Sequence, residues 1–333
     1  MKDIPLVRVR YVDSFAQQLN TLGAPTERLL NTVNLAEEML GYRDGFIPVR
    51  QLWRLTALAA RYTGIWEMGL RAGMTPLVEH SQFGQNLLFA PTLYQAMSLF
   101  CSMAPAELTN AQFSIKRDRQ VIWFCGGPVE GSDEEVRQVE LYRLGMIVQV
   151  IRWAAGCDWK PAELQLQSQT LAHLRESNLI ENTRVRTGSR ELAVAISPVL
   201  ISQPLKSLGN GSQPAPPSVA GPDLDVKSAL KEVIRTHVRG GRGTVRGVAR
   251  SLDMSERTLY RRLSSHGLSF SQLVDQVRVE TATALLSESN LPIGDIAREA
   301  GYSEPTHFSR AFKRITGNSP HQYRIHLQAS QQQ

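Results

Sequence analysis

Apolar residues recur every three to four positions in two short stretches near the C-terminus. The spacing i, i+3, i+4, i+7 places such residues in one stripe along a helix. The stretches lie about 48 residues apart and consist of Val245, Val248, Ala249 and Leu252, then Ile293, Ile296, Ala297 and Ala300. Each stretch predicts a short amphipathic helix, and the repeat predicts that one structural design occurs twice.

A turn and a second helix follow each of these stripes. Ser255 and Ser303 stand after the turns, where a hydroxyl can cap the next helix by accepting a bond from a free N–H group. The expected buried stripes of the second helices are Leu259 and Leu263 in one copy, and Phe308, Ala311, Phe312 and Ile315 in the other. Aligning these stripes makes the second turn one residue longer. The sequence therefore predicts two helix-turn-helix units.

The stretch between the two units, residues 270–288, contains neither glycine nor proline, so we expect a continuous helix. At 1.5 Å per residue it would span roughly 27 Å. With its flanking turns it would hold the second helix of each unit, the recognition helix, about one duplex turn, roughly 34 Å, from the other. One chain would then reach two successive major grooves.

The first two thirds of the chain alternate between helical and strand-like patterns. Helices are expected at residues 12–22, 25–33, 49–62, 92–103 and 133–155, and strands at 112–116, 120–125, 162–167 and 191–197. Residues 116–119 are expected at the tip of a hairpin between the first two strands. The predicted fold is an α+β N-terminal domain joined to an all-α C-terminal domain with two helix-turn-helix units.

Residues 209–222 are rich in glycine, proline and serine and lack an apolar period, which is typical of a linker. The predicted domains are therefore 1–208 and 223–327, followed by a frayed tail at 328–333. Residues 223–333 contain 16 Lys and Arg against 11 Asp and Glu, a net charge of +5, whereas residues 1–222 contain 21 against 20. Such a basic domain is suited to attract phosphates, although many solvated helices are also basic.

Several classes of function are disfavoured by the sequence. We expect no signal peptide and no membrane span, hence a cytoplasmic protein. The widely spaced Cys101, Cys125 and Cys157 are interpreted as buried apolar residues in a reducing compartment, with thiol sensing as the alternative. No metal, cofactor or catalytic constellation is predicted, so we expect that the protein is not an enzyme.

The run PIGDIAREAGYSEPTHFSRAFKRITGNSPHQYR, residues 292–324, resembles the signature of the AraC/XylS family of bacterial transcription regulators. The resemblance extends upstream through VARSLDMSERTLYRRL and the positions Arg278, Ala282, Leu285 and Leu286, so it covers about the last hundred residues. The segments PVRQLWRLTALAARYTG, MGLRAG and FAPTLYQAMSLFC are similar to the arabinose-binding N-terminal region of one branch of that family. This second resemblance implies a sensor and dimerisation domain for a small molecule, without transferring any ligand residue.

The recognition-helix faces and the family resemblance together predict the DNA contacts. The expected base contacts are Arg257, Tyr260, Arg261, Thr306, His307 and Arg310. Arginine can pair with two acceptors of guanine in the major groove. The expected phosphate contacts are Ser255, Arg262, Ser303 and Lys313. Pro305 departs from a polar base reader because it cannot donate a hydrogen bond, so the second helix is expected to hold mainly the backbone.

No effector-binding residues can be assigned from the sequence. The tryptophans at positions 53, 66, 123, 153 and 159 are interpreted as core, with a ligand pocket as the alternative. Arg54 and Arg61 are interpreted as solvated, although either could hold a carboxylate effector.

The sequence thus predicts a sequence-specific DNA-binding transcription regulator, with activation favoured over repression. The expected partners are double-stranded DNA, RNA polymerase, an unknown small-molecule effector and a second copy of the chain. The alternative is a low-specificity architectural DNA-binding protein, which would more often use minor-groove wedges.

Overall fold

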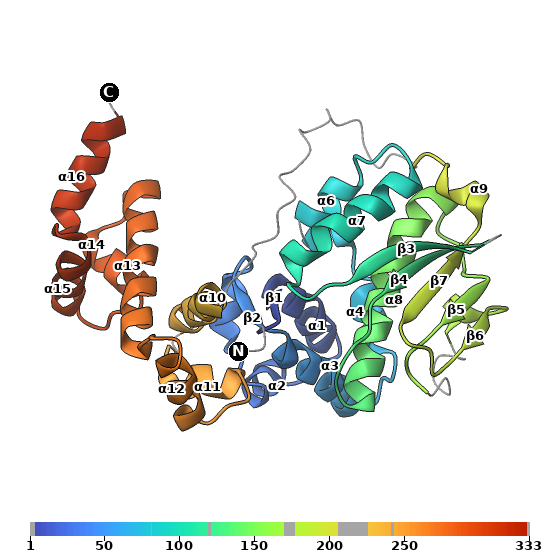
Figure 1. Cartoon of the computed structure of the whole chain (residues 1–333), viewed down its shortest axis with the longest axis horizontal. Coiled ribbons are helices and arrows are strands. Elements are labelled where there is room, and N and C mark those ends of the chain that lie inside the picture. The colour runs from blue at the N-terminus through green and yellow to red at the C-terminus, as the bar shows by residue number, and fades with distance from the viewer. Residues whose placement is uncertain are drawn as a thin grey trace. The chain divides into compact units, whose positions relative to one another are not determined.

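The computed structural model describes residues 4–80, 82–118, 121–169, 177–205, 226–240 and 243–331. The chain divides into two compact units, and Figure 1 labels most of their elements. The sheet unit comprises residues 5–29 and 49–223, and the helical unit comprises residues 1–4, 30–48 and 224–333. The predicted linker, 209–222, and positions 332–333 of the tail lie outside the described residues, so the boundary at the linker stays a prediction.

The sheet unit contains a five-stranded sheet in the order β3-β4-β7-β5-β6. These strands are β3 (Phe113–Asp118), β4 (Val121–Gly126), β7 (Leu192–Ile196), β5 (Glu163–Gln165) and β6 (Arg184–Arg186). All neighbours are antiparallel except β5 and β6, which are parallel. The central strand β7 has the sequence LAVAI and is buried throughout, as expected for a strand that is covered on both faces.

Helices and short segments complete the sheet unit, and α7 packs on β3 while α8 packs against β4 and β7. The elements are β1 (Leu6–Arg8), α1 (Arg10–Thr21), α3 (Val49–Thr63), α4 (Met68–Gly73), α5 (Leu77–His80), α6 (Gln82–Leu87), α7 (Leu93–Glu107), α8 (Asp133–Ala155), η3 (Asn178–Ile180) and α9 (Pro198–Ile201). Helix α2 (Thr26–Thr32) contains the residues at which the chain passes from the sheet unit to the helical unit.

Helix α8 is the main support of the sheet unit. It begins with a capping box, in which Ser132 accepts the Glu135 N–H and the Glu135 carboxylate accepts the Ser132 N–H at 2.8 Å. Helix α4 crosses α8 so closely that a Cβ on Gly73 would lie 2.3 Å from the carbonyl oxygen of Tyr142. Only glycine allows this approach, which fixes α8 at the level of Tyr142.

The helical unit contains both predicted helix-turn-helix units. Its elements are η1 (Glu37–Gly41), β2 (Phe46–Pro48), α10 (Val226–Arg239), α11 (Val245–Ser251), α12 (Glu256–Ser264), α13 (Phe270–Glu288), α14 (Ile293–Glu299), α15 (Pro305–Thr316) and α16 (Pro320–Gln331). The connecting helix α13 has the predicted bounds. The core of the second half gathers apolar side chains of α13, α14 and α15 around Phe308 and Phe312, both of which are fully buried.

Most predicted elements of the sheet unit are confirmed within a few residues, but several short ones were not predicted. Strands β1 and β6 and helices α4, α5, α6 and α9 of this unit, and β2 of the helical unit, were not predicted, because they are too short to show a hydrophobic period. The hairpin of β3 and β4 is confirmed and pairs Asp118 with Val121, while Arg119 of the expected tip lies outside the described residues.

Three expectations about burial are wrong. Ile315 is 42% exposed, because the buried stripe of α15 closes at Phe312, against which Tyr323 of α16 packs with ring centroids 5.4 Å apart. Trp66 is 41% exposed rather than part of the core. Cys157 is exposed, since it follows the end of α8 instead of lying within it.

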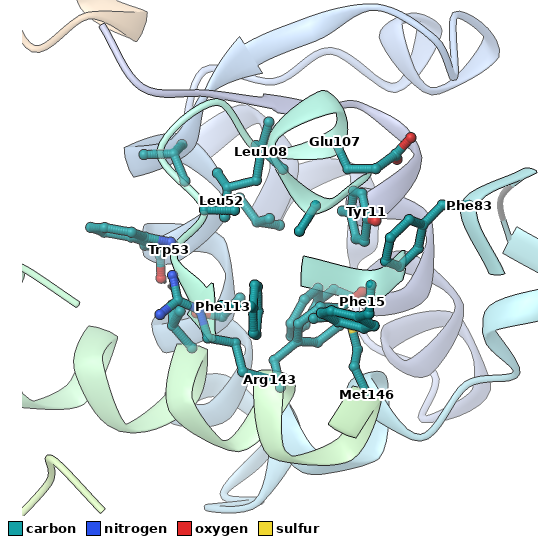
Figure 2. A pocket seen from close by; sticks show the side chains of 18 residues that line it. Tyr11, Phe15, Leu52, Trp53, Phe83, Glu107, Leu108, Phe113, Arg143 and Met146 are labelled. Atoms are coloured by element: carbon teal, nitrogen blue, oxygen red, sulfur yellow. Dashed lines mark hydrogen bonds between the residues drawn. The ribbon is translucent and has the colours of Figure 1, made fainter. Parts of the chain in front are cut away.

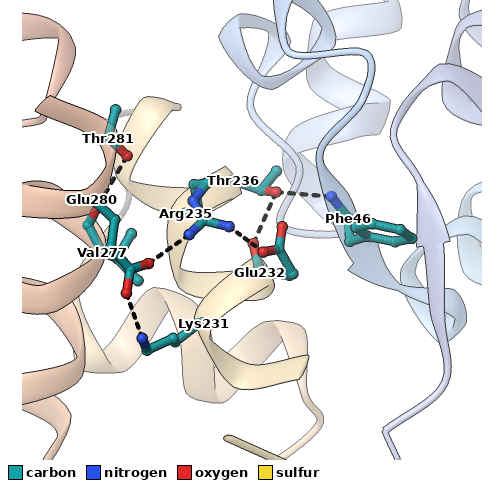
Figure 3. Close-up of polar contacts among 8 residues, drawn as sticks. All are labelled: Phe46, Lys231, Glu232, Arg235, Thr236, Val277, Glu280 and Thr281. Carbon is teal, nitrogen blue, oxygen red and sulfur yellow. Dashed lines mark hydrogen bonds and ion pairs between the residues drawn. The ribbon is translucent and has the colours of Figure 1, made fainter. Parts of the chain in front are cut away.

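Residues 30–48 pack against α10 and α11 within the helical unit, although the sequence analysis placed them with the N-terminal domain. The Phe46 N–H donates to the Thr236 hydroxyl at 3.1 Å in a buried bond (Figure 3), and the Asn34 side-chain amide donates to the Gly247 carbonyl at 2.8 Å. The Arg239 guanidinium lies 4.2 Å from the centre of the Tyr42 ring. This segment is therefore part of the structural support of the first helix-turn-helix unit.

Candidate nucleic-acid interface and ligand cavity

The first helix-turn-helix unit presents its predicted DNA contacts to solvent. Ser255 caps α12 by accepting the Thr258 N–H at 3.1 Å, as the sequence predicts. Leu259 and Leu263 are buried, which turns the opposite side of α12 outward. The predicted contacts Arg257, Tyr260, Arg261 and Arg262 are all exposed. One compact helix therefore displays three guanidinium groups and one phenol.

The second unit repeats this design with one change at the start of its recognition helix. Ser303 does not cap α15, because the N-cap is Glu304, which makes no side-chain capping bond. The longer turn, 300–304 instead of 252–255, moves the N-cap one residue beyond the position equivalent to Ser255. Pro305 then occupies the first helical position, where its missing N–H removes one donor that would need a cap. The expected capping role of Ser303 is therefore wrong, and its hydroxyl is exposed.

Both turns use a left-handed backbone at the equivalent position. Asp253 has φ 57° in the first turn, and Gly301 has φ 81° in the second, 48 positions later in the numbering. Glycine adopts this conformation without strain, and aspartate tolerates it better than most other residues. The repeat that the apolar spacing predicts therefore extends to the backbone of the turns.

Three predicted contacts of the second unit border one open polar hollow. Ser303, His307 and Arg310 line it, together with Arg314, Tyr302 and, from α13, Arg278 and Asp275. Arg314 forms an ion pair with Asp275, so two arginines remain to give the hollow a positive charge. Tyr302 Oη and Arg278 Nε are buried and have no hydrogen-bond partner within the described part of the chain. Thr306 and Lys313 are exposed but do not line the hollow.

Helix α13 joins the two helix-turn-helix units and is held to α10 by ion pairs. Glu280 of α13 accepts from Lys231 at 2.5 Å and from Arg235 at 2.8 Å, and Arg235 also pairs with Glu232 (Figure 3). Burial of Leu273, Val277 and Ala282 along α13 adds an apolar seam. The 19 residues of α13 thus form a fixed spacer of roughly 27 Å between the two helix-turn-helix units.

The sheet unit contains a cavity that the sequence analysis did not find. The volume of this cavity is about 60 Å³. Aromatic side chains dominate the lining, with Phe15, Phe100, Phe113 and Trp53 among them (Figure 2). Of the predicted tryptophans, Trp53 alone lines this cavity, and neither Arg54 nor Arg61 does.

Charged and phenolic groups also line the cavity. Arg143 is 4% exposed, and burial lowers its pKa to about 10, which leaves it protonated at neutral pH. Burial and the nearby Glu107 raise the pKa of Tyr11 well above its usual value. Burial also raises the pKa of Tyr142. A sequence signal for this site exists in retrospect: Glu140 and Arg143 are charged residues directly before the most apolar run of α8, residues 144–151.

The thiols and acidic groups of the described residues offer no metal site. No group of three or more His, Cys, Asp or Glu side chains there could hold a metal ion. Burial raises the pKa values of Cys101 and Cys125 to about 11, so both thiols stay protonated at neutral pH. Within the described residues, no helix has the length and apolar character needed to cross a bilayer.

Both halves of the chain match known protein families. A family model described as the arabinose-binding domain of AraC transcription regulators matches residues 23–205, and a helix-turn-helix domain model matches residues 248–325. The HTH-type transcriptional regulator VqsM of Pseudomonas aeruginosa is 45% identical over 76 residues, which cover 23% of each chain. The ornithine utilization regulator of the same species is 36% identical over 104 residues, 30% of this chain and 31% of that one.

The transcriptional activator NphR of a Rhodococcus species is 30% identical over 95 residues, 28% of each chain. Each of these matches spans less than a third of the relative's length, whereas the arabinose-binding model alone covers more than half of this chain. Both recognition helices, α12 and α15, display exposed arginines, and both belong to the helical unit. The chain therefore belongs to the AraC family of transcription regulators, which are DNA-binding proteins and not enzymes.

Proposed function

We propose that this protein is a sequence-specific transcription activator that acts as a dimer and responds to a small-molecule effector through its sheet unit. The observation that carries the proposal is the pair of recognition helices, α12 and α15, which display exposed arginines from two similar motifs joined by α13. Two short recognition helices on a common spacer are suited to two successive major grooves of one duplex.

The proposed division of labour follows from the chemistry of the exposed side chains. Arg257, Tyr260 and Arg261 of α12 contact base edges, and an arginine that pairs with guanine discriminates by about 1–3 kcal/mol. Ser255 and Arg262 contact phosphates that fix the orientation of α12.

The second unit has a larger share of backbone contacts. Arg310 and His307 contact bases from α15, and Thr306 adds a hydroxyl near the start of this helix, beside the non-donating Pro305. Ser303 and Lys313 contact phosphates. The positive hollow beside α15 supports this assignment, because buried polar atoms without partners, such as Tyr302 Oη, are usually satisfied by water or by a ligand.

Effector control is supported by two features of the chain. The sheet unit contains an aromatic cavity, and α3 supplies Val49, Leu52 and Trp53 to its lining. Residues 30–48, which end where α3 begins, pack on α10 of the helical unit through the bond between Phe46 and Thr236. The arabinose-binding match, residues 23–205, covers this segment and all of the cavity lining except Val7, Tyr11 and Phe15. Binding in the cavity would act on the DNA-binding helices through this continuous segment.

Binding-site selection with the purified full-length chain at about 150 mM salt tests the proposal, because nonspecific phosphate contacts are already weakened there. We expect an enriched motif with two short blocks about one helical turn, roughly 10 base pairs, apart for each chain. Uniform binding without a motif would contradict it.

The Arg261→Ala, Arg310→Ala double variant distinguishes the specific regulator from an architectural DNA-binding protein. A regulator loses affinity for its selected site much more than for random DNA, because base contacts carry the preference. An architectural protein, which holds the backbone, weakens equally on both.

Activation and dimerisation need separate measurements. Sedimentation of the full chain should give twice its mass of 37.1 kDa. Transcription with purified RNA polymerase from a promoter that carries the selected motif should increase when the protein is added. A monomer in sedimentation, or a decrease in transcript, would refute the corresponding part of the proposal. The activator role draws support from the similarity to NphR.

A further inference from the structure

The cavity of the sheet unit has the lining of a site for one small ring. Its volume of about 60 Å³ is less than half that of an apolar cavity of roughly 150 Å³ that accepts benzene, so a ring would have to displace some of the side chains that line it. The surrounding rings already pack edge to face: Phe100 lies 4.8 Å from Phe113 and 5.0 Å from Phe83, with interplanar angles of 77° and 70°. A planar aromatic ligand would continue this arrangement, which is favourable for aromatic pairs.

The charges around the cavity are not balanced locally. Glu107 lies 3.7 Å from Arg8 and 3.9 Å from Arg10, so two guanidinium groups compensate its carboxylate. Arg143, at a different side of the cavity, forms no ion pair with any described residue (Figure 2). One of its Nη atoms donates to the Gly127 carbonyl at 2.6 Å, and its guanidinium lies 5.6 Å from the centre of the Phe113 ring.

Glu140 is the carboxylate whose charge acts on Arg143, but its oxygens are committed elsewhere. They accept from the N–H groups of Gln167 and Ser168 and, at 2.7 Å, from the Ser168 hydroxyl. A buried guanidinium without a direct counter-ion is costly, and its planar fork fits a carboxylate with two hydrogen bonds. The cavity therefore combines an apolar aromatic wall with one guanidinium that makes no direct ion pair with a described residue.

We propose that the cavity binds a small aromatic monocarboxylate, with the ring among Phe100, Phe113 and Trp53 and the carboxylate paired with Arg143. This proposal adds a ligand class to the proposed effector control. Only the effect of ligand binding on regulation rests on that earlier proposal. The ligand class itself follows from the lining and the charge of the cavity. A polyol is disfavoured, since most of the lining could not return its hydrogen bonds.

Calorimetric titration of the full-length protein with four probes tests the ligand class. Benzoate carries both ring and charge, benzamide has the ring without the charge, benzylamine reverses the charge, and acetate lacks the ring. We expect benzoate to bind at least about tenfold more tightly than benzamide, with no measurable binding of benzylamine or acetate. Equal affinity for benzoate and benzamide, or no binding of benzoate at about 10 mM, would overturn the proposal.

Two variants locate the binding and separate charge from shape. Arg143→Met keeps an unbranched apolar chain, so it should remove the preference for benzoate over benzamide while ring binding remains. Ala104→Leu adds bulk at a residue that lines the cavity and should abolish binding of both ring probes. Arg61→Met is the matched control, because this arginine is exposed, pairs with Glu134 and does not line the cavity. Unchanged benzoate binding in Ala104→Leu would place the ligand elsewhere and refute the site.

Because Arg143 also bonds to Gly127, its variant is accepted only if its thermal unfolding remains cooperative. Should it fail to fold, Ala104→Leu and the comparison of probes on the unaltered protein still decide the proposal. Parallel gel shifts on the selected DNA site keep the two proposals apart. Benzoate binding without any change in DNA affinity or transcription would leave the ligand class standing and refute effector control.

Discussion

At the scale of single residues, adjacent arginines of α12 are expected to have different roles. Both Arg261 and Arg262 are exposed, but Arg262 lies 3.5 Å from the Met254 sulfur beside the turn, whereas Arg261 shares the outward face with Arg257. From these positions we expect Arg261 to contact a base and Arg262 to contact a phosphate.

Arg261→Ala should lose about 1–3 kcal/mol of discrimination at one position of the selected site. Arg262→Ala should instead weaken binding to all sequences evenly and reduce the slope of log affinity against log salt by about one. Competition gel shifts with single-base variants of the site, repeated at several salt concentrations, measure both effects. The assignment is wrong if the two variants change specificity equally.

The two serines that precede the recognition helices form a second matched pair. Ser255→Ala removes a real N-cap and should lower the free energy of unfolding by about 1 kcal/mol. Ser303→Ala should leave it within about 0.5 kcal/mol, because that hydroxyl caps nothing. Both variants should bind DNA less tightly through the lost phosphate contact. Urea unfolding at matched conditions gives the comparison, and a larger loss for Ser303→Ala would contradict the role assigned to Glu304 as N-cap.

The difference between these serines also shows where sequence reasoning was limited. The apolar spacing predicted both motifs and even the extra turn residue. It did not predict that this extra residue, followed by Pro305, moves the N-cap from Ser303 to Glu304. The cap depends on the exact backbone path of the turn, which a hydrophobic period does not specify.

At the scale of elements, features that depend on neighbouring residues in the sequence were predicted, whereas features that depend on distant residues were not. Helix α13 was predicted to the residue because the absence of glycine and proline is a local property of the sequence. The cavity was not, since its lining joins Tyr11, Trp53, Phe113 and Arg143, which come from α1, α3, β3 and α8. Its members resemble ordinary core residues one by one, and only the packing of α8 brings them together.

The packing of residues 30–48 on α10 was equally invisible to sequence patterns, and it makes a testable contribution to stability. Thr236→Val keeps the shape of the side chain but removes the hydroxyl that accepts the Phe46 N–H. Loss of one such hydrogen bond costs about 0.5–1.5 kcal/mol, so the free energy of unfolding of the helical unit should fall by that amount. Hydrogen exchange of the Phe46 amide should accelerate in parallel.

Thr281→Val is the control, because the Thr281 hydroxyl bonds only to the Val277 carbonyl of its own helix at 2.9 Å (Figure 3). This variant should leave the exchange of Phe46 unchanged. If Thr236→Val leaves it unchanged as well, the bond does not hold the segment in solution, and the proposed route from α3 to α10 loses its support.

At the scale of the whole molecule, charge is concentrated where DNA is expected to bind. Residues 223–333 carry a net +5 and residues 1–222 only +1, so the C-terminal part of the chain supplies most of the attraction to phosphates. Some of its cations are already engaged within the protein: Lys231 and Arg235 hold Glu280, and Arg314 holds Asp275. The number of phosphates neutralised by one chain should therefore be well below the number of its basic residues.

Of the four proposed phosphate contacts per chain, only Arg262 and Lys313 are cations that release counterions, so the slope of log affinity against log salt should be about −1.8 on random DNA. Affinity for random DNA should accordingly fall by roughly tenfold between 50 and 200 mM salt. Affinity for the selected site should fall along a similar slope from a higher starting value, because base contacts add affinity without releasing counterions. Fluorescence anisotropy with both DNAs across this range measures the two slopes, with the Arg261→Ala, Arg310→Ala double variant as the control. A slope close to the full count of basic residues would mean that the internal ion pairs of the helical unit open on DNA, and the fixed spacing assigned to α13 would then have to be abandoned.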